Sequence, residues 1–114
     1  MREPSRDKGR LEHIVKYATN VEEMVAGITY EEFMNDKIRY FAIMKNIEIV
    51  GEAAYMLSKE FIIMHTELPW RQIIGMRHVL VHGYATVSKK ELWQTAINDI
   101  PPLKKQILKY LENM

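Results

Sequence analysis

Cysteine is absent from the 114 residues of this chain. Its absence excludes disulfides, thiolate metal sites and cysteine nucleophiles, and it fits a reducing cytoplasm. Long apolar runs are missing too, since stretches such as FIIM at 61–64 are far too short to cross a membrane. The amino-terminal segment, MREPSRDKGR, is polar and does not resemble a signal peptide. We therefore expect a cytoplasmic protein that makes no membrane contact.

A strong excess of charge of either sign is also missing. Sixteen lysines and arginines face fifteen acidic residues, which gives a net charge of +1. Proteins that wrap long nucleic acids usually have a clear basic excess. If this chain handles RNA, we expect it to bind a short stretch at a local site. The length predicts one domain over residues 1–114, and 47% hydrophobic residues are normal for a globular domain.

Helix-breaking residues are scarce, with five glycines and four prolines. From about residue 7 to 26, apolar residues recur every three or four positions, as in an amphipathic helix. Gly27 ends this stripe, and TYEE at 29–32 has the pattern of a capping box. A short helix and then a long one are expected up to about residue 64. Gly51 lowers helix stability there, and close approach of another backbone would explain its presence.

The second half of the chain shows the same helical pattern. LPW at 68–70 restarts a helix, and Gly83 is a candidate for its end. SKKE at 88–91 resembles a second capping box, and the prolines at 101–102 should break or kink the helix that follows. No segment shows sustained alternation of apolar and polar residues. The sequence predicts an all-α fold, an antiparallel up-and-down bundle of four to five helices.

Reactive side chains are dense in one segment only, MRHVLVHGY at 76–84. At about 100° per residue, Arg77 and Tyr84 point nearly the same way, whereas His78 and His82 share another face. Arg77 and His82 diverge by about 140° on an ideal helix. They can meet at one substrate only if the helix loosens at the following glycine or if a second chain completes the site. This geometry favours a dimer.

These groups suit the cleavage of RNA phosphodiesters. An arginine binds phosphate through paired donors and keeps its charge. A histidine can take the proton from a 2′-hydroxyl or give one to the leaving oxygen. The RNA supplies its own nucleophile, so no metal is required, and DNA, which lacks that hydroxyl, should not be cut.

Spacing alone leaves structural roles open. Such residues near a helix end more often cap carbonyls at the negative end of the helix dipole. His78 and His82 have the spacing of a zinc-binding pair, but the glutamate of the HExxH pattern and a third ligand are missing, so no metal site is expected. Glu52, within IVGEAAYML, is either solvated on an outer face or paired with an arginine or histidine.

The cluster resembles a known signature. Arg77, four residues, His82, one residue and Tyr84 match the Arg-x4-His-x-Tyr motif of HEPN ribonucleases. More closely, the chain resembles HepT-like toxins of bacterial and archaeal toxin–antitoxin pairs. Three blocks resemble that family in the right order and cover most of the chain: RDKGRLEHIV, IEIVGEAAYMLSKEF and LPWRQIIGMRHVLVHGY.

The resemblance implies a HEPN-like helical homodimer with two motifs facing each other. It implies a metal-independent endoribonuclease without a cofactor, in which Arg77 and His82 are catalytic. The implied partner is a minimal nucleotidyltransferase antitoxin of a type VII-like system, which adds AMP to Tyr84 and blocks RNA by bulk and charge. His78 stands where the family commonly has Asn or Asp. Glu52 matches the acid of the family's Gly-Glu-Ala block, which suggests that it supports the site.

Two rival interpretations remain open. The chain could be a non-catalytic HEPN module that binds nucleotide or RNA for a partner nucleotidyltransferase, because a fold does not fix a function. It could also be a plain dimerisation bundle in which histidine and arginine cap a helix.

Overall fold

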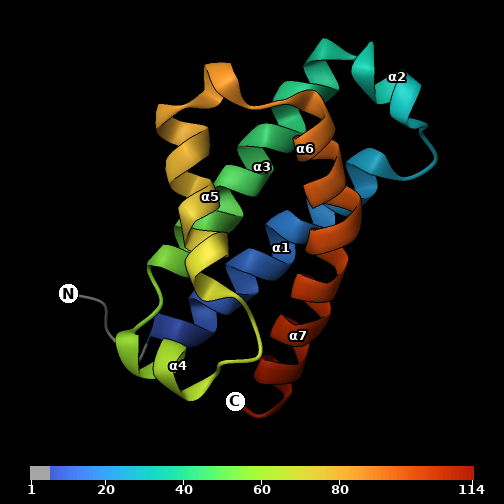
Figure 1. The fold of residues 1–114 in the computed structure, drawn as a ribbon. Coiled ribbons are helices and arrows are strands. Elements are labelled where there is room, and N and C mark those ends of the chain that lie inside the picture. Colours follow the sequence, from blue (N-terminus) through green and yellow to red (C-terminus); the bar gives the residue numbers. More distant parts are fainter. Residues whose placement is uncertain (1–5) are drawn as a thin grey trace.

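The computed structural model describes residues 6–114, except for the side chain of Tyr84, and it shows a bundle of helices (Figure 1). No strand occurs in this part of the chain, so the predicted all-α fold is confirmed. The elements in chain order are α1 (Asp7–Val25), α2 (Tyr30–Met34), α3 (Lys37–Tyr55), α4 (Lys59–Met64), α5 (Trp70–His82), a 3-10 turn (Tyr84–Thr86), α6 (Lys89–Gln94), a π-helical segment (Thr95–Asp99) and α7 (Ile100–Glu112).

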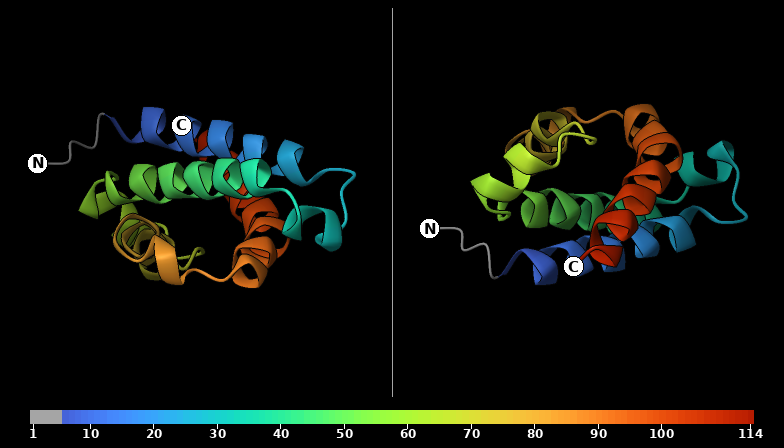
Figure 2. Two further views of the ribbon diagram at one scale, coloured as in Figure 1. Left: turned by 90° about the horizontal axis from the view of Figure 1, so that it is seen from above. Right: turned by 90° about the horizontal axis from the view of Figure 1, so that it is seen from below.

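Four long rods make up the bundle: α1, α3, α5 and the continuous run from α6 to α7. Helix α3 lies between α1 and α5, while α7 packs against α1 (Figure 2). Leu11, Ile14 and Ile43 are among the fully buried side chains at the centre, together with Ile47 and Ile107. None of the described helices combines the length and hydropathy that crossing a bilayer requires.

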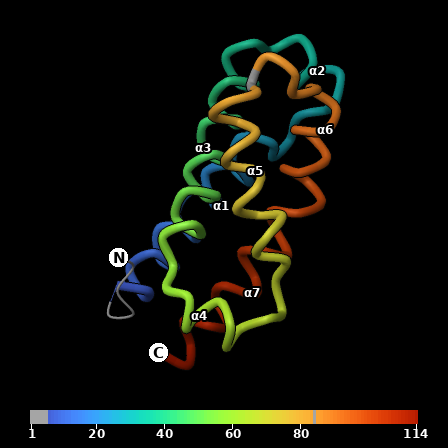
Figure 3. Tube along the Cα trace, turned by 60° about the vertical axis from the view of Figure 1, so that its left-hand side comes forward, coloured from blue at the N-terminus to red at the C-terminus, as the bar shows by residue number. Residues whose placement is uncertain are grey.

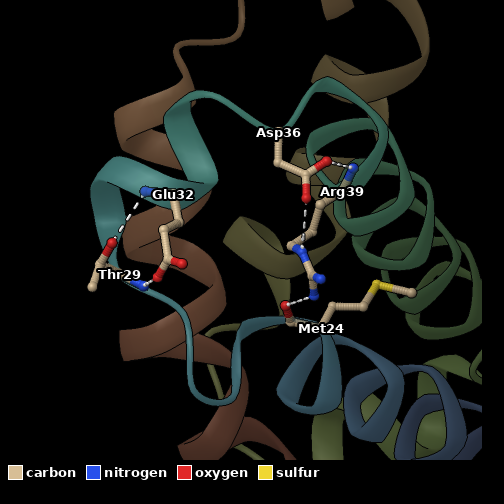
Figure 4. A network of polar contacts seen from close by, with 5 residues as sticks. All are labelled: Met24, Thr29, Glu32, Asp36 and Arg39. Atoms are coloured by element: carbon tan, nitrogen blue, oxygen red, sulfur yellow. Dashed lines mark hydrogen bonds and ion pairs between the residues drawn. The ribbon is translucent and has the colours of Figure 1, made fainter.

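The turn from α1 to α3 is fixed by helix caps, as Figure 4 shows. The predicted capping box is present, since Glu32 N–H donates to Thr29 Oγ1 (3.1 Å) and Thr29 N–H donates to Glu32 Oε1 (2.8 Å). Arg39 donates to the Met24 carbonyl (2.6 Å) and to the Asp36 carboxylate (3.2 Å). Hydrogen bonds from the backbone and then the side chain of Arg39 lower the pKa of Asp36. These contacts set the antiparallel return of the chain.

The cap at the start of α6 is simpler than predicted. Glu91 N–H donates to Ser88 Oγ (2.9 Å), but the reciprocal bond of a capping box is not formed. Both residues are exposed, and an exposed donor at a helix end can be satisfied by solvent instead of a side chain.

A buried carboxylate joins α1 to α4. Asp7 is only 4% exposed, and its two oxygens accept hydrogen bonds from the backbone N–H (2.9 Å) and the hydroxyl (2.6 Å) of Ser58. The same hydroxyl oxygen accepts from Phe61 N–H (3.1 Å) and caps α4. The start of α1 is therefore held directly beside the end of α3.

The paired prolines do not break the last rod. Pro101 and Pro102 have no N–H, so they cannot bond to the carbonyls four residues earlier. The chain shifts to π-helical spacing here, with Ile100 N–H donating to the Thr95 carbonyl, and then continues as α7.

Candidate functional site

The site is organised around a close crossing of α3 and α5, which run side by side in Figure 3. A Cβ placed on Gly51 would lie 2.7 Å from the Cβ of Arg77 and 3.1 Å from its backbone nitrogen. Real Cβ atoms do not approach other atoms so closely, so only glycine fits at this crossing. The close backbone approach predicted for Gly51 is thus confirmed, and Arg77 is the residue that it faces.

The crossing brings the guanidinium of Arg77 to the end of α3. Its Nε forms an ion pair with Glu52 Oε2, and its Cζ lies 5.1 Å from the centre of the Tyr55 ring. The Arg77 side chain is 30% exposed and that of Glu52 46%. Among the described residues, the terminal amino groups of Arg77 form no hydrogen bond. They therefore remain available to an external anion such as phosphate.

Of the two residues that contact Arg77, the sequence indicated Glu52 but not Tyr55. An arginine or histidine was expected as one partner for Glu52, and the structure selects Arg77. Tyr55 was not singled out from the sequence. Its only signal is its position three residues after Glu52, which places both on neighbouring parts of one helix face. Tyr55 is partly exposed, so its ring also forms part of the surface beside the arginine.

The two histidines form a pair of their own. His78 and His82 are exposed on α5, with ring centres 4.7 Å apart and planes inclined by 51°. In the described part of the chain, no hydrogen bond joins either histidine to Arg77. Helix α5 stays α-helical through His82, so the predicted divergence of Arg77 and His82 persists.

Hydrogen bonds of Gly83 and Thr86 terminate α5. Gly83 N–H donates to the Val79 carbonyl (2.7 Å), and Thr86 N–H and Oγ1 donate to the Gly83 carbonyl (2.9 and 2.8 Å). Gly83 ends the helix as predicted, with a φ of −125°, outside the left-handed region. The backbone continues into the 3-10 turn that begins at Tyr84. The side chain of Tyr84, the expected modification site, lies outside the described residues.

Apolar side chains are exposed on the helices that carry the site. Ile38 and Phe41 on α3 are 84% and 48% exposed, and Val79 and Val81 on α5 are 49% and 37% exposed. Such apolar surface on a small protein is typical of contact with another protein. Within residues 6–114, Tyr84 side chain aside, no three His, Cys, Asp or Glu residues are grouped for a metal ion.

A search with family models matched residues 14–110 to the family described as ribonuclease HepT-like. The chain is 39% identical over 102 residues to a protein named "Putative RNase TTE0752" of Caldanaerobacter subterraneus subsp. tengcongensis, covering 90% of this chain and 91% of that one. It is 39% identical over 97 residues to "Probable ribonuclease HepT" of Thermococcus cleftensis, covering 85% and 88% of the two chains.

A third relative, "Putative RNase MJ1216" of Methanocaldococcus jannaschii, is 31% identical over 112 residues, with 97% of this chain and 93% of that one covered. No solved structure gave a significant match.

Replacing Gly51 tests the crossing. We expect Gly51→Ala to destabilise the fold by about 1–3 kcal/mol, because the added methyl group overlaps the backbone and Cβ of Arg77. Gly75→Ala on α5 is the matched control, since a Cβ there meets nothing within 4 Å, and it should stabilise the helix by about 0.5–1 kcal/mol. Urea denaturation of both variants provides the measurement, and equal stabilities would contradict the proposed close approach.

Proposed function

We propose that this chain, which belongs to the HepT-like ribonuclease family, is a toxin that cleaves RNA without a metal ion. The observation that supports this most directly is Arg77, whose Nε is held by Glu52 while its terminal amino groups stay open. A fixed, permanently charged fork of donors suits a phosphate that gains charge during cleavage. Glu52 is then a positioning residue, since it acts through the arginine.

His82 is the proposed acid–base catalyst. It removes the proton from the 2′-hydroxyl of the RNA, whose oxygen attacks the adjacent phosphorus, or it protonates the departing 5′-oxygen. The P–O5′ bond breaks as the 2′-O–P bond forms, which leaves a cyclic phosphate and a free 5′-hydroxyl. Because the nucleophile belongs to the substrate, DNA should resist cleavage. The exposure of His82 on α5 leaves its ring accessible to such a substrate.

His78 is a neighbour of this machinery. Its ring centre lies 4.7 Å from that of His82, so the two imidazoles are neighbours on the exposed surface of α5. We assign it a supporting role, although a polar amide or carboxylate is the more common choice at this position in the family.

A homodimer would complete the site. Arg77 and His82 diverge on a helix that stays regular between them, so one copy does not direct both groups at one phosphate. The exposed apolar side chains of α3 and α5 provide surface on which a second copy can pack. Each proposed site then combines Arg77 of one protomer with His82 of the other.

The proposed inhibitor is a minimal nucleotidyltransferase that transfers AMP to Tyr84. This residue follows His82 by two positions, at the start of the turn after α5. An AMP group on this residue adds bulk and negative charge to the proposed RNA-binding site, so RNA is excluded by occupancy and repulsion.

Removing either catalytic side chain tests the activity. We expect His82→Ala and Arg77→Ala to slow RNA cleavage about 10²-fold or more in excess chelator, because acid–base and electrostatic catalysis each contribute that much. Arg71→Ala, which removes an exposed arginine of the same helix, should cleave at the wild-type rate. Circular dichroism checks that each variant is folded. RNA binding without cleavage by the wild-type chain would instead support a non-catalytic nucleotide- or RNA-binding module for a nucleotidyltransferase.

Coexpressing the two inactive variants tests the shared site. If Arg77 and His82 act across the interface, random pairing should restore about a quarter of the wild-type rate, because half of the dimers are mixed and each has one intact site. If both residues act within one protomer, every mixture stays inactive, and the shared-site proposal is wrong.

The inhibitor is tested by mass spectrometry. After coexpression with a minimal nucleotidyltransferase encoded beside this gene, we expect the chain to gain one or more AMP units and to lose RNA cleavage. Tyr84→Phe should remain unmodified because it lacks the acceptor hydroxyl. AMP found on another residue, with Tyr84 untouched, would refute the proposed point of control.

A further inference from the structure

A second basic surface lies on α1, outside the site described above. Arg6, Arg10, His13 and Tyr17 follow one another at spacings of four, three and four residues, so they share an arc of about 60° on the helix. Arg6 and His13 are exposed, and Arg10 and Tyr17 are half-buried. We refer to these four residues as the α1 stripe.

The first three residues of the stripe surround a hollow. This open depression of about 350 Å³ is lined by Arg6, Gly9, Arg10 and His13. A Cβ on Gly9 would meet no atom within 4 Å, so no other group fills the space next to this glycine. An arginine has five N–H donors and no acceptor, and two arginines with an imidazole therefore create surroundings suited to an anion.

Flat rings continue the stripe beyond the hollow. The rings of His13 and Tyr17 are stacked, with centres 5.1 Å apart and planes 12° from parallel. Lys16 Nζ lies 5.6 Å from the centre of the Tyr17 ring. Cations interleaved with exposed ring faces are typical of surfaces that bind single-stranded nucleic acids, where phosphates meet the cations and bases stack on the rings.

The charge of this segment differs from that of the whole chain. Residues 6–17 contain four lysines and arginines but only two acids, while the complete chain has a net charge of +1. One of these acids, Asp7, is buried and accepts two hydrogen bonds from Ser58. The other, Glu12, lies about 130° around the helix from the middle of the stripe. The nearly neutral total thus conceals a local basic surface.

The stripe also lies within reach of the proposed cleavage site. The bond from Asp7 to Ser58 holds the start of α1 at the end of α3 where Glu52 and Tyr55 lie. Helix α3 separates α1 from α5, as Figure 2 shows. Two neighbouring helix spacings amount to about 16–20 Å, a distance that a few nucleotides of single-stranded RNA bridge.

We propose that the α1 stripe binds the backbone of the RNA substrate a few nucleotides from the cut, as a second and sequence-independent binding site. This inference rests on the proposed function only in taking RNA as the ligand. The guanidinium groups hold phosphates beside the hollow, and the exposed ring of His13, stacked on Tyr17, accepts a neighbouring base. The stripe adds affinity for long RNA and takes no part in the chemical step.

Binding at different salt concentrations tests this site. The stripe variant carries Arg6→Gln and Arg10→Gln. The control variant carries Lys105→Gln and Lys109→Gln, which remove the same charge from exposed positions of α7. Both are made in the His82→Ala background so that RNA is not cut. For a labelled single-stranded RNA of about 20 nucleotides, the stripe variant should lower the slope of log K against log salt by about 1.4, because each lost phosphate contact contributes about 0.7. The α7 variant should keep the original slope.

Cleavage kinetics separate this inference from the proposed function. In the chain that retains His82, the stripe variant should raise KM for the long RNA, leave kcat unchanged and cleave a trinucleotide as the unmodified chain does. If the unmodified chain cleaves RNA but the stripe variant keeps the same salt slope and KM, the second site is refuted and the ribonuclease stands. If no RNA is cleaved but the slope falls as predicted, the binding site stands without the ribonuclease.

Two further measurements separate a loss of RNA binding from unfolding and from altered self-association. Thermal melting of both double variants establishes that a weaker affinity does not come from unfolding. Size-exclusion chromatography records their oligomeric state. If the stripe variant loses self-association while its salt slope for RNA is unchanged, the stripe is a protein contact, and the proposal is overturned.

Discussion

The absence of a side chain at Gly51 is the constraint on which the site depends. It lets α3 and α5 approach until the backbone of Arg77 faces that of the glycine. The next residue on α3, Glu52, then meets the guanidinium, and Tyr55 lies beside it one turn later. A larger residue would push the two helices apart and so disturb the contacts of Arg77 with Glu52 and Tyr55. Glycine lowers the stability of α3 at this position, but it allows Glu52 and Tyr55 to hold the Arg77 side chain in place.

The sequence was most informative where local chemistry decides the structure. Apolar periodicity and the capping pattern at Thr29 depend on neighbouring residues, and they predicted the first helix and the first turn correctly. The long helix expected up to about residue 64 was wrong in its extent, because it ends at Tyr55 and a separate helix, capped by Ser58, follows from Lys59 to Met64. The glycine in a long helix was also interpreted correctly, because close packing is the main reason for a helix to accept its cost. For Glu52, the sequence predicted only that the partner would be an arginine or a histidine. The two residues of the pair are 25 positions apart, and the packing of α3 on α5 determines that Arg77 is the partner.

Other features left little trace in the sequence. Tyr55 joins the arginine because of the angle at which two helices cross, and no local pattern encodes that angle. The prolines at 101–102 indicated a disturbance, but its form as π-helical spacing depends on how neighbouring helices hold the rod together. Ser88 was expected to start a full capping box, but only the bond from Glu91 N–H to its hydroxyl forms, and both residues are exposed to solvent.

The buried bond between Asp7 and Ser58 has a consequence for the life of the nascent chain. Its two residues lie 51 positions apart, so the Asp7 carboxylate is synthesised well before the Ser58 hydroxyl exists. At typical rates of about 5–20 residues per second, some 3–10 s pass before the two can meet. During this interval the start of α1 lacks its contact with Ser58, and the Asp7 carboxylate stays hydrated. The contact that joins α1 to α4 can therefore form only after α3 has been translated.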